Sequence, residues 1–174
     1  MIRTGEEYRE SIRDEREVWI NGERVADVPS HPMFKPIVDI RARIYDMAHD
    51  LATRDIMTVV DETGERFAVG PRLPHTQDDW RAKRRAVDAV MDDIGGVVTR
   101  VGDETVGEMW SLYDGQDVLN EIDPTFSANI RRHVDFAARN DPFHVSANTD
   151  PKGDRSKRPQ EQDPEVQAEW DFGR

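Results

Sequence analysis

Prolines set the limits of the regular structure in this 174-residue chain. A proline lacks the backbone donor that a helix needs, and it biases the residue before it towards extended conformations. Prolines gather at 29–36 and 71–74, and others stand at 124 and 142. The sequence therefore predicts several separate helices that fit between these points.

Five stretches carry helix signals. Thr4 is a good N-cap, and Glu7 completes a capping box, which predicts a helix over residues 5–16. Thr76 caps an acidic start in the same way, and we expect its helix to bend or end at Gly95-Gly96. The other stretches place apolar residues at helical spacing, and they cover 37–49, 97–119 and 124–140.

Two hairpins interrupt these helices. Asn21-Gly22 lies between short apolar runs and is the strongest short hairpin signal in the chain. Ile56–Val60 has β character, and Glu62-Thr63-Gly64 can turn the chain back. We predict a mainly α domain over residues 1–140 with two small β-hairpins, followed by an extended polar segment over 141–174.

The charge balance argues against some partners. The chain has 36 acidic and 24 basic residues and a net charge of -12, so nucleic acid phosphates would be repelled. It lacks the run of about 18 apolar residues that a membrane span needs, and its first residues do not form a secretory signal. We expect a cytoplasmic protein with no membrane contact. Many acids with few lysines fit either a high-salt cytoplasm or a GC-rich genome.

Standard catalytic patterns are missing from the sequence. With no cysteine, it excludes disulfides, thiolate metal sites and iron–sulfur clusters. The five histidines lack metal-ligand spacing, so we predict no metal site. Asp78-Asp79 and Asp92-Asp93 are interpreted as solvated helix faces, and no phosphate loop or nucleophile motif is present.

The polar stretch at 141–164 is the most specific candidate site. Asn148-Thr149-Asp150-Pro151 can hold turns and present polar groups to a ligand. Four cations then fall within seven residues of a strongly acidic protein, as an anionic ligand or a pyrophosphate would need: Lys152, Arg155, Lys157 and Arg158. The alternative is a solvated tail whose cations pair with the acidic domain.

The block NTDPKGDRSKRPQEQDP resembles the central segment of the 4-hydroxyphenylacetate 3-hydroxylase family, which also contains the 4-hydroxybutyryl-CoA dehydratases. RTGEEYRESIRDEREVWINGERV and HPMFKPIVDIRARIYDMAHD are similar to the start of that family, in the same order. The resemblance implies an acyl-CoA-dehydrogenase-like N-terminal helical domain, with 141–174 facing a flavin and leading towards a β domain that this chain lacks. The flavin contacts that it implies are Thr149, Asp150, Pro151, Arg155 and Gln162.

Departures from the family pattern bear on the activity. The dehydratases carry cluster cysteines in the helix matching 96–100, and this chain has none, so the resemblance favours hydroxylase chemistry. Hydroxylases hold the phenol with an Arg, a Tyr and a His, but the matching positions here are Asp114, Val118 and Ser146. His144, two residues away, and Ser146 are the catalytic candidates.

The resemblance implies two alternative functions. The chain is the N-terminal part of an oxygenase that takes reduced FAD from a flavin reductase, hydroxylates a phenol-type substrate and needs a partner chain carrying the β and C-terminal domains. The alternative is a truncated, non-catalytic remnant or binding module. Helix faces that meet the remaining domains would be exposed in either case, so we expect an oligomer.

Overall fold

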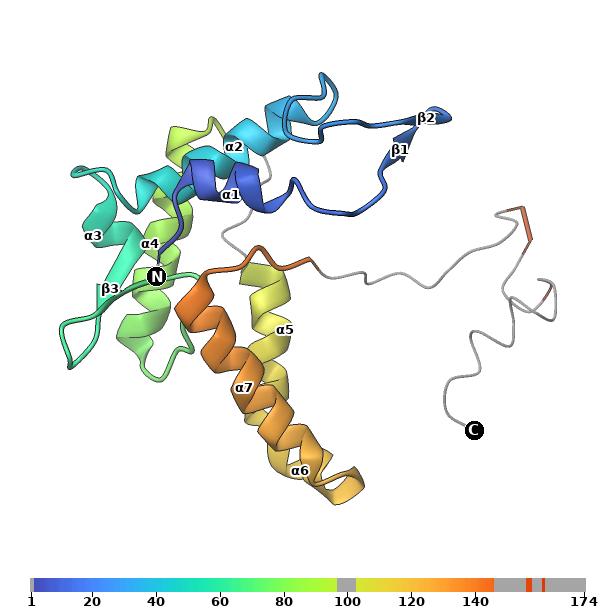
Figure 1. Cartoon of the computed structure of the whole chain (residues 1–174). Helices are drawn as coiled ribbons and strands as arrows, with labels where there is room; N and C mark the ends of the chain where they lie inside the picture. Colours follow the sequence, from blue (N-terminus) through green and yellow to red (C-terminus); the bar gives the residue numbers. More distant parts are fainter. Residues whose placement is uncertain (1, 97–102, 146–155, 158–160, 162–174) are drawn as a thin grey trace. The chain divides into compact units, whose positions relative to one another are not determined.

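The computed structural model describes residues 2–96, 103–145, 156–157 and 161 (Figure 1). The chain divides into two compact units, Met1–His144 and Val145–Arg174. Every helix and strand of the described residues lies in the first unit. The second unit contributes only Val145, Ser156, Lys157 and Glu161 to the description.

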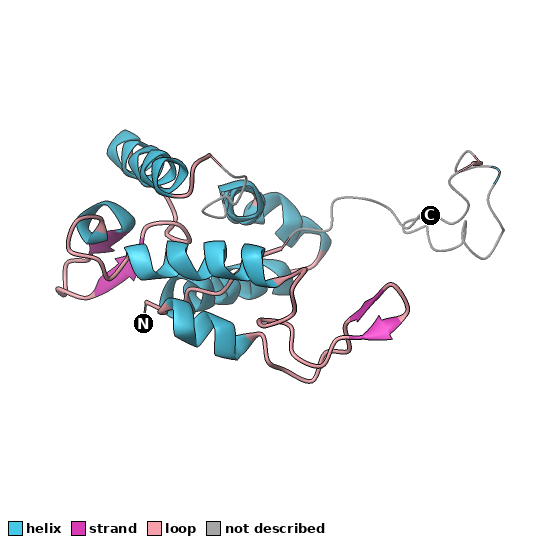
Figure 2. Ribbon diagram, turned by 90° about the horizontal axis from the view of Figure 1, so that it is seen from above, coloured by secondary structure: helices cyan, strands magenta, loops and turns pink. Residues whose placement is uncertain are grey.

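The first unit is mainly helical, as predicted (Figure 2). Its helices are α1 (Gly5–Ser11), α2 (Lys35–Met47), α3 (Arg54–Met57), α4 (Gln77–Asp93), α5 (Asp103–Asp114), α6 (Gln116–Ile122) and α7 (Thr125–Asn140). Its strands form two antiparallel hairpins, β1 (Trp19–Ile20) with β2 (Glu23–Arg24) and β3 (Thr58–Val60) with β4 (Arg66–Ala68). None of the helices in the described residues is long and apolar enough to span a membrane.

Local signals placed several elements correctly. Thr4 and Thr76 both cap their helices through complete capping boxes, with Glu7 and Asp79 as the third helical residues. Asn21 and Gly22 both have positive φ, 52° and 83°, as a two-residue hairpin turn with the favoured twist requires. The predicted β1–β2 hairpin is confirmed.

Three predicted boundaries were wrong. Helix α1 ends at Ser11 and not near Arg16, because the Asp14 side chain accepts a hydrogen bond from the Arg16 N–H at 3.1 Å and competes with helical pairing. The stretch predicted as a strand from Ile56 begins as the helical turn α3, and the strand starts only at Thr58. The helical run to Leu119 is divided at Gly115 into α5 and α6.

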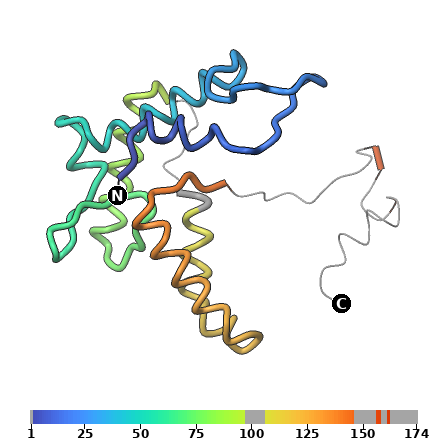
Figure 3. Tube along the Cα trace, in the orientation of Figure 1, coloured from blue at the N-terminus to red at the C-terminus, as the bar shows by residue number. Residues whose placement is uncertain are grey.

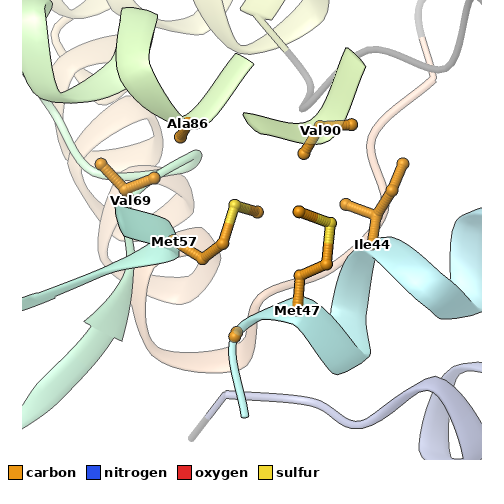
Figure 4. Packing of buried hydrophobic residues seen from close by; sticks show 7 residues of the cluster. Ile44, Met47, Met57, Val69, Ala86 and Val90 are labelled. Carbon is orange, nitrogen blue, oxygen red and sulfur yellow. The ribbon is translucent and has the colours of Figure 1, made fainter. Parts of the chain in front are cut away.

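The largest core cluster joins α2, α3, α4 and the end of the β3–β4 hairpin. Figure 4 shows its side chains pointing towards one another. Met47 and Val90 are fully buried and lie on α2 and α4. Beside them the cluster contains Ile44, Ala48, Met57, Val69 and Ala86. This packing sets α4 against α2, and Arg43 adds two hydrogen bonds to Asp93 at 2.7 and 2.8 Å.

Two smaller clusters position the remaining helices. Tyr8 of α1 packs on α2 against Val38, Ala42 and Tyr45. Ala137 of α7 packs on α5, against Val106, Met109 and Trp110. The helices therefore form an α1–α2 pair and an α5–α7 pair.

Lys83 links the second hairpin to α4 and α5. Its ammonium donates hydrogen bonds to the carbonyl oxygens of Val69 at 2.7 Å and Gly70 at 2.8 Å. It also lies 4.2 Å from the centre of the Trp110 ring, a cation–π contact. Burial lowers the pKa of Lys83 to about 7. The Lys83 amine therefore holds the chain where it leaves β4.

Helices α1 and α2 approach closely at Gly5. The Gly5 N–H donates to the Asp46 carboxylate at 2.7 Å, and Gly5 is buried. A Cβ added at Gly5 would lie 2.5 Å from the carbonyl oxygen of Ala42. This distance is too short for any side chain, so only glycine permits this contact.

Gly5→Ala should destabilise the protein by roughly 2 kcal/mol or more, because the methyl group forces α1 away from α2. Gly107→Ala is the matched control, since a Cβ there meets open space inside α5 and should stabilise by about 1 kcal/mol. Urea denaturation followed by circular dichroism measures both. Equal stability of the two variants would contradict the close approach.

Candidate functional site

The chain that leaves α7 folds back onto α1 and α2 (Figure 3). Asp141 ends the helix in the left-handed conformation, with φ 46° and ψ 51°, and its N–H donates to the Ala137 carbonyl at 3.0 Å. A left-handed residue other than glycine, placed before a proline, costs about 1–3 kcal/mol. Contacts from α1 and α2 therefore have to hold it.

Four side chains supply these contacts, and with Asp141 we call them the exit cluster: Tyr8, Arg41, Tyr45 and Phe143. The Tyr45 hydroxyl donates to the Asp141 carbonyl oxygen at 3.2 Å. The Arg41 guanidinium lies 3.8 Å from the centre of the Phe143 ring. Tyr8 meets the edge of that ring at 6.3 Å between centroids and stacks on Tyr45 at 5.2 Å.

A cavity of about 60 Å³ opens beside the exit cluster. Its polar side is formed by Arg41, Tyr45, Asp141 and His144. Apolar side chains from α2, α3, β4 and α5 form the rest, among them Ile44, Ala48, Met57, Ala68 and Val106. Apolar walls with a few converging polar groups also line small-molecule sites, although those pockets are several times larger, about 300–1,000 Å³.

Burial shifts the protonation of the groups around this cavity. It raises the pKa of the Asp141 carboxyl to about 6, against a smaller opposing effect of a backbone hydrogen bond from Arg3. It lowers the pKa of the Arg41 guanidinium and raises that of the Tyr45 hydroxyl. Several titratable groups with shifted pKa values beside one cavity mark a candidate functional site.

His144 is the described residue here with an unused polar atom. Its Nε2 is buried and has no hydrogen-bond partner in the described structure. Burial lowers the pKa of His144, and His133, whose ring centre lies 5.4 Å away, lowers it further. A buried polar atom without a hydrogen-bond partner costs free energy. A hydrogen bond to a ligand would remove that cost, so the His144 Nε2 is a candidate ligand contact.

Two of the three positions that match the family's phenol-binding residues, Asp114 and Val118, lie within the described residues. Asp114 lines a different groove, with Trp80, Trp110 and Tyr113. Val118 is 67% exposed on α6. His144 lines the cavity described above, so Asp114 and His144 occupy separate pockets.

The other predicted site residues lie outside the described residues. They are Ser146, Thr149, Asp150, Pro151, Arg155 and Gln162. The sequence prediction also missed the exit cluster. Arg41 and Tyr45 stand four residues apart on one helix face, which was the available signal. The apolar stripe of the same helix concealed it.

Comparison with known proteins identifies the family. The profile described as 4-hydroxyphenylacetate 3-hydroxylase N terminal matches residues 4–169. The chain belongs to this family. The resemblance that the sequence motifs indicated is therefore confirmed.

Relatives of the hydroxylase family match the chain over most of its length. The 4-hydroxyphenylacetate 3-monooxygenase oxygenase component of Thermus thermophilus is 29% identical over 91% of this chain and 32% of its own length. The 2,4,6-trichlorophenol monooxygenase of Cupriavidus pinatubonensis is 31% identical over 90% of this chain and 31% of its own. The chain thus spans about a third of the length of these relatives.

Solved structures of the family share the fold. The oxygenase component of 4-hydroxyphenylacetate 3-monooxygenase, complexed with FAD and 4-hydroxyphenylacetate, superposes with a TM-score of 0.77 and 28% identity, over 92% of this chain and 33% of that one. A 4-hydroxybutyryl-CoA dehydratase from N. maritimus gives a TM-score of 0.77 and 26% identity, over 95% and 33%. The predicted N-terminal helical domain is confirmed.

Asp141→Asn should stabilise the protein at pH 7.5 and leave its stability unchanged at pH 4. The pKa of Asp141 is raised from 3.8 to about 6, so the folded state favours the neutral carboxyl, and that stabilisation is lost as the pH rises through about 6. Asparagine keeps a neutral side chain of the same shape and tolerates the left-handed conformation.

Thermal unfolding at the two pH values measures the effect, with roughly 2–4 °C expected for each kcal/mol. Asp135→Asn, at an exposed acid on α7, is the control and should show little change at either pH. The prediction would be contradicted if the Asp141→Asn variant were less stable than the wild type at pH 7.5.

Proposed function

We propose that this chain is the N-terminal domain of an FADH2-dependent hydroxylase that acts on a phenol. The observation that carries the proposal is its match, over 92% of its length, to an oxygenase component solved with FAD and 4-hydroxyphenylacetate. Its relatives are named for a hydroxyphenylacetate, a chlorophenol and a nitrophenol, which share a phenol ring. We therefore propose phenols as the substrate class and do not name a single substrate.

Two sets of residues in this chain are assigned to the flavin and to the phenol in this proposal. The segment from Thr149 to Gln162 supplies cations and amides to hold FAD, as the family resemblance implies. The cavity beside the exit cluster offers the His144 Nε2 to the phenol hydroxyl. When bound, FADH2 would supply the two electrons that reduce dioxygen, so that one oxygen atom enters the ring as a hydroxyl and the other leaves as water. His144 would orient the phenol by a hydrogen bond.

Hydroxylase chemistry is favoured over dehydratase chemistry. The two kinds of relative match the fold equally well, with TM-scores of 0.77. The chain contains no cysteine that could ligate an iron–sulfur cluster. One hydroxylase relative is solved in complex with FAD, and another is named as an FADH2-dependent monooxygenase.

Two further partners follow from the proposal. A flavin reductase has to supply FADH2, since the relatives are oxygenase components. The remaining two thirds of the oxygenase have to complete the flavin cleft, because the chain spans about a third of its relatives. We place this assembly in the cytoplasm, in keeping with the absence of cysteine from the sequence.

Assembly with the remaining domains tests the function. The chain is co-expressed with a polypeptide that carries the other two thirds of the Thermus thermophilus oxygenase component, and FADH2 and a phenol are added. We expect a co-eluting complex that retains FAD and releases a catechol, whereas the chain alone gives no product. The authentic first third of the Thermus oxygenase is the matched control.

Three outcomes separate the candidate functions. A catechol product supports the hydroxylase. A complex that retains no FAD and forms no product favours the alternative of a non-catalytic binding module. No complex with this chain, when the authentic first third assembles, would overturn the proposal.

His144→Ala should lower the rate of catechol formation by the assembled enzyme roughly tenfold or more, because the phenol loses the hydrogen bond that orients it. His75→Ala is the control, since His75 is exposed and lines the other groove. Product is measured by chromatography at saturating FADH2. Equal rates for the two variants would remove His144 from the site.

A further inference from the structure

A second groove lies between α4, α5 and the residues that lead into α4. Its volume is about 470 Å³, which is within the range of small-molecule pockets, whereas the cavity beside the exit cluster holds about 60 Å³. One face of α5 lines it with four residues at helical spacing: Gly107, Trp110, Ser111 and Asp114. Trp80 of α4, Tyr113 and residues 73–75 line the rest. We call this the tryptophan groove.

Three aromatic side chains line the tryptophan groove: Trp80, Trp110 and Tyr113. The Trp80 and Trp110 rings meet at 85° with 5.3 Å between their centres, so they form two walls at right angles. Trp80 is 53% exposed, whereas Trp110 is buried. The face of an aromatic ring carries partial negative charge, and several such faces around one space bind organic cations. The exposed Trp80 ring is therefore open to such a ligand.

Lys83 shows that a ring of this groove attracts a cation. Its Nζ lies 4.2 Å from the centre of the Trp110 ring and donates hydrogen bonds to the Val69 and Gly70 carbonyl oxygens. Lys83 is not among the described residues that line the groove, so a ligand there would meet Trp80 instead. Burial lowers the pKa of Lys83 to about 7. At pH 8 most of its amine is therefore neutral and repels a second cation only weakly.

Asp114 supplies the negative charge of the tryptophan groove. It is the one carboxylate among the described residues that line the groove, and neither a lysine nor an arginine lies among them. No described residue forms an ion pair with Asp114. Two arginines, Arg72 and Arg131, line the adjoining groove. The Ser111 hydroxyl already donates to the Gly107 carbonyl oxygen at 3.0 Å. The groove therefore combines aromatic faces with a carboxylate that is available to a cation.

We propose that the tryptophan groove is a binding site for a small quaternary ammonium ion. A quaternary nitrogen has no N–H group, so it donates no hydrogen bond and binds through methyl groups that pack on aromatic rings. Asp114 adds a Coulombic attraction that a neutral ligand does not gain. A phenol would use the same rings but would leave the carboxylate unpaired, so the charge favours the cation. The site is independent of the proposed function, because it uses none of the residues assigned there to the flavin or to the phenol.

Choline is the probe, and 3,3-dimethylbutan-1-ol is its neutral control of the same shape. Each is titrated into the full chain at pH 8 and constant ionic strength, phenol is titrated as a third ligand, and proton–nitrogen NMR spectra follow the indole N–H signals. We expect choline to shift the Trp80 and Trp110 signals saturably and to leave that of Trp19, on β1, unchanged. The neutral alcohol should bind at least about tenfold more weakly, because it lacks the charge.

Asp114→Asn should weaken choline binding about fivefold, because it removes the charge and keeps the shape of the side chain. Asp117→Asn is the matched control, since Asp117 is an exposed acid on α6 that is not among the residues lining the groove. This variant should bind choline like the wild type. Equal Kd values for the two variants would overturn the assignment of the groove to a cation.

Gly107→Leu fills the groove without removing a side chain. A Cβ added at Gly107 meets no atom within 4 Å, so the new side chain extends into open space. Leucine also favours a helix more than glycine does, and circular dichroism should show an unchanged helical content. We expect this variant to bind no choline. Trp80→Ala should weaken binding about tenfold, since it removes the exposed wall.

The combined outcomes decide whether the site exists. Saturable choline binding that Asp114→Asn weakens and Gly107→Leu prevents supports it. Equal binding of choline and the neutral alcohol overturns it, and so does binding of phenol without binding of choline. If a variant does not fold, the comparison of choline with the alcohol in the wild type decides. None of these results bears on the hydroxylase, which the assembly experiment tests separately.

Discussion

Burial of α2 on two sides is the constraint on which the rest of the structure depends. One side carries Ile44 and Met47 into the largest core cluster, against α3 and α4. The other carries Val38 and Ala42 against Tyr8 of α1. A helix that is packed on two sides cannot rotate about its axis without breaking both sets of contacts. It therefore provides a fixed base for Arg41 and Tyr45, which hold the chain after α7.

Charge is distributed unevenly along the sequence. The chain has a net charge of -12, yet four cations fall within residues 152–158. Inside the first unit, the half-buried Lys83 donates hydrogen bonds to two backbone carbonyl oxygens and lies over an aromatic ring. The cations of the polar segment are therefore the better candidates for an anionic ligand, and the acidic surface repels competing polyanions.

Under the proposed function, the candidate site would be one part of a larger cleft. The chain covers about a third of the relatives with which it shares its fold. Within that third, the cavity at His144 is small, about 60 Å³, and its polar groups come from three separate parts of the chain: α2, the end of α7 and the residues that follow it. A phenol and a flavin would need further walls, and the proposed function assigns those walls to the remaining domains.

The sequence by itself determined the elements whose signals are local. Capping boxes at Thr4 and Thr76, the Asn21-Gly22 turn and the stop before Pro142 depend on neighbouring residues, and the structure contains each of them. The motif around 148–164 also identified the family, which the profile match confirmed.

Only the tertiary structure decided which side chains meet. Phe143 and Arg41 lie 102 positions apart in the chain, and Tyr45 and Asp141 lie 96 apart. Likewise, Asp114 and the candidate His144 line different pockets of the described structure. Periodicity identifies the buried face of a helix but not its partner. The partner depends on how α1, α2 and α7 pack, and that packing is a long-range outcome of burying Met47, Val90 and Ala137.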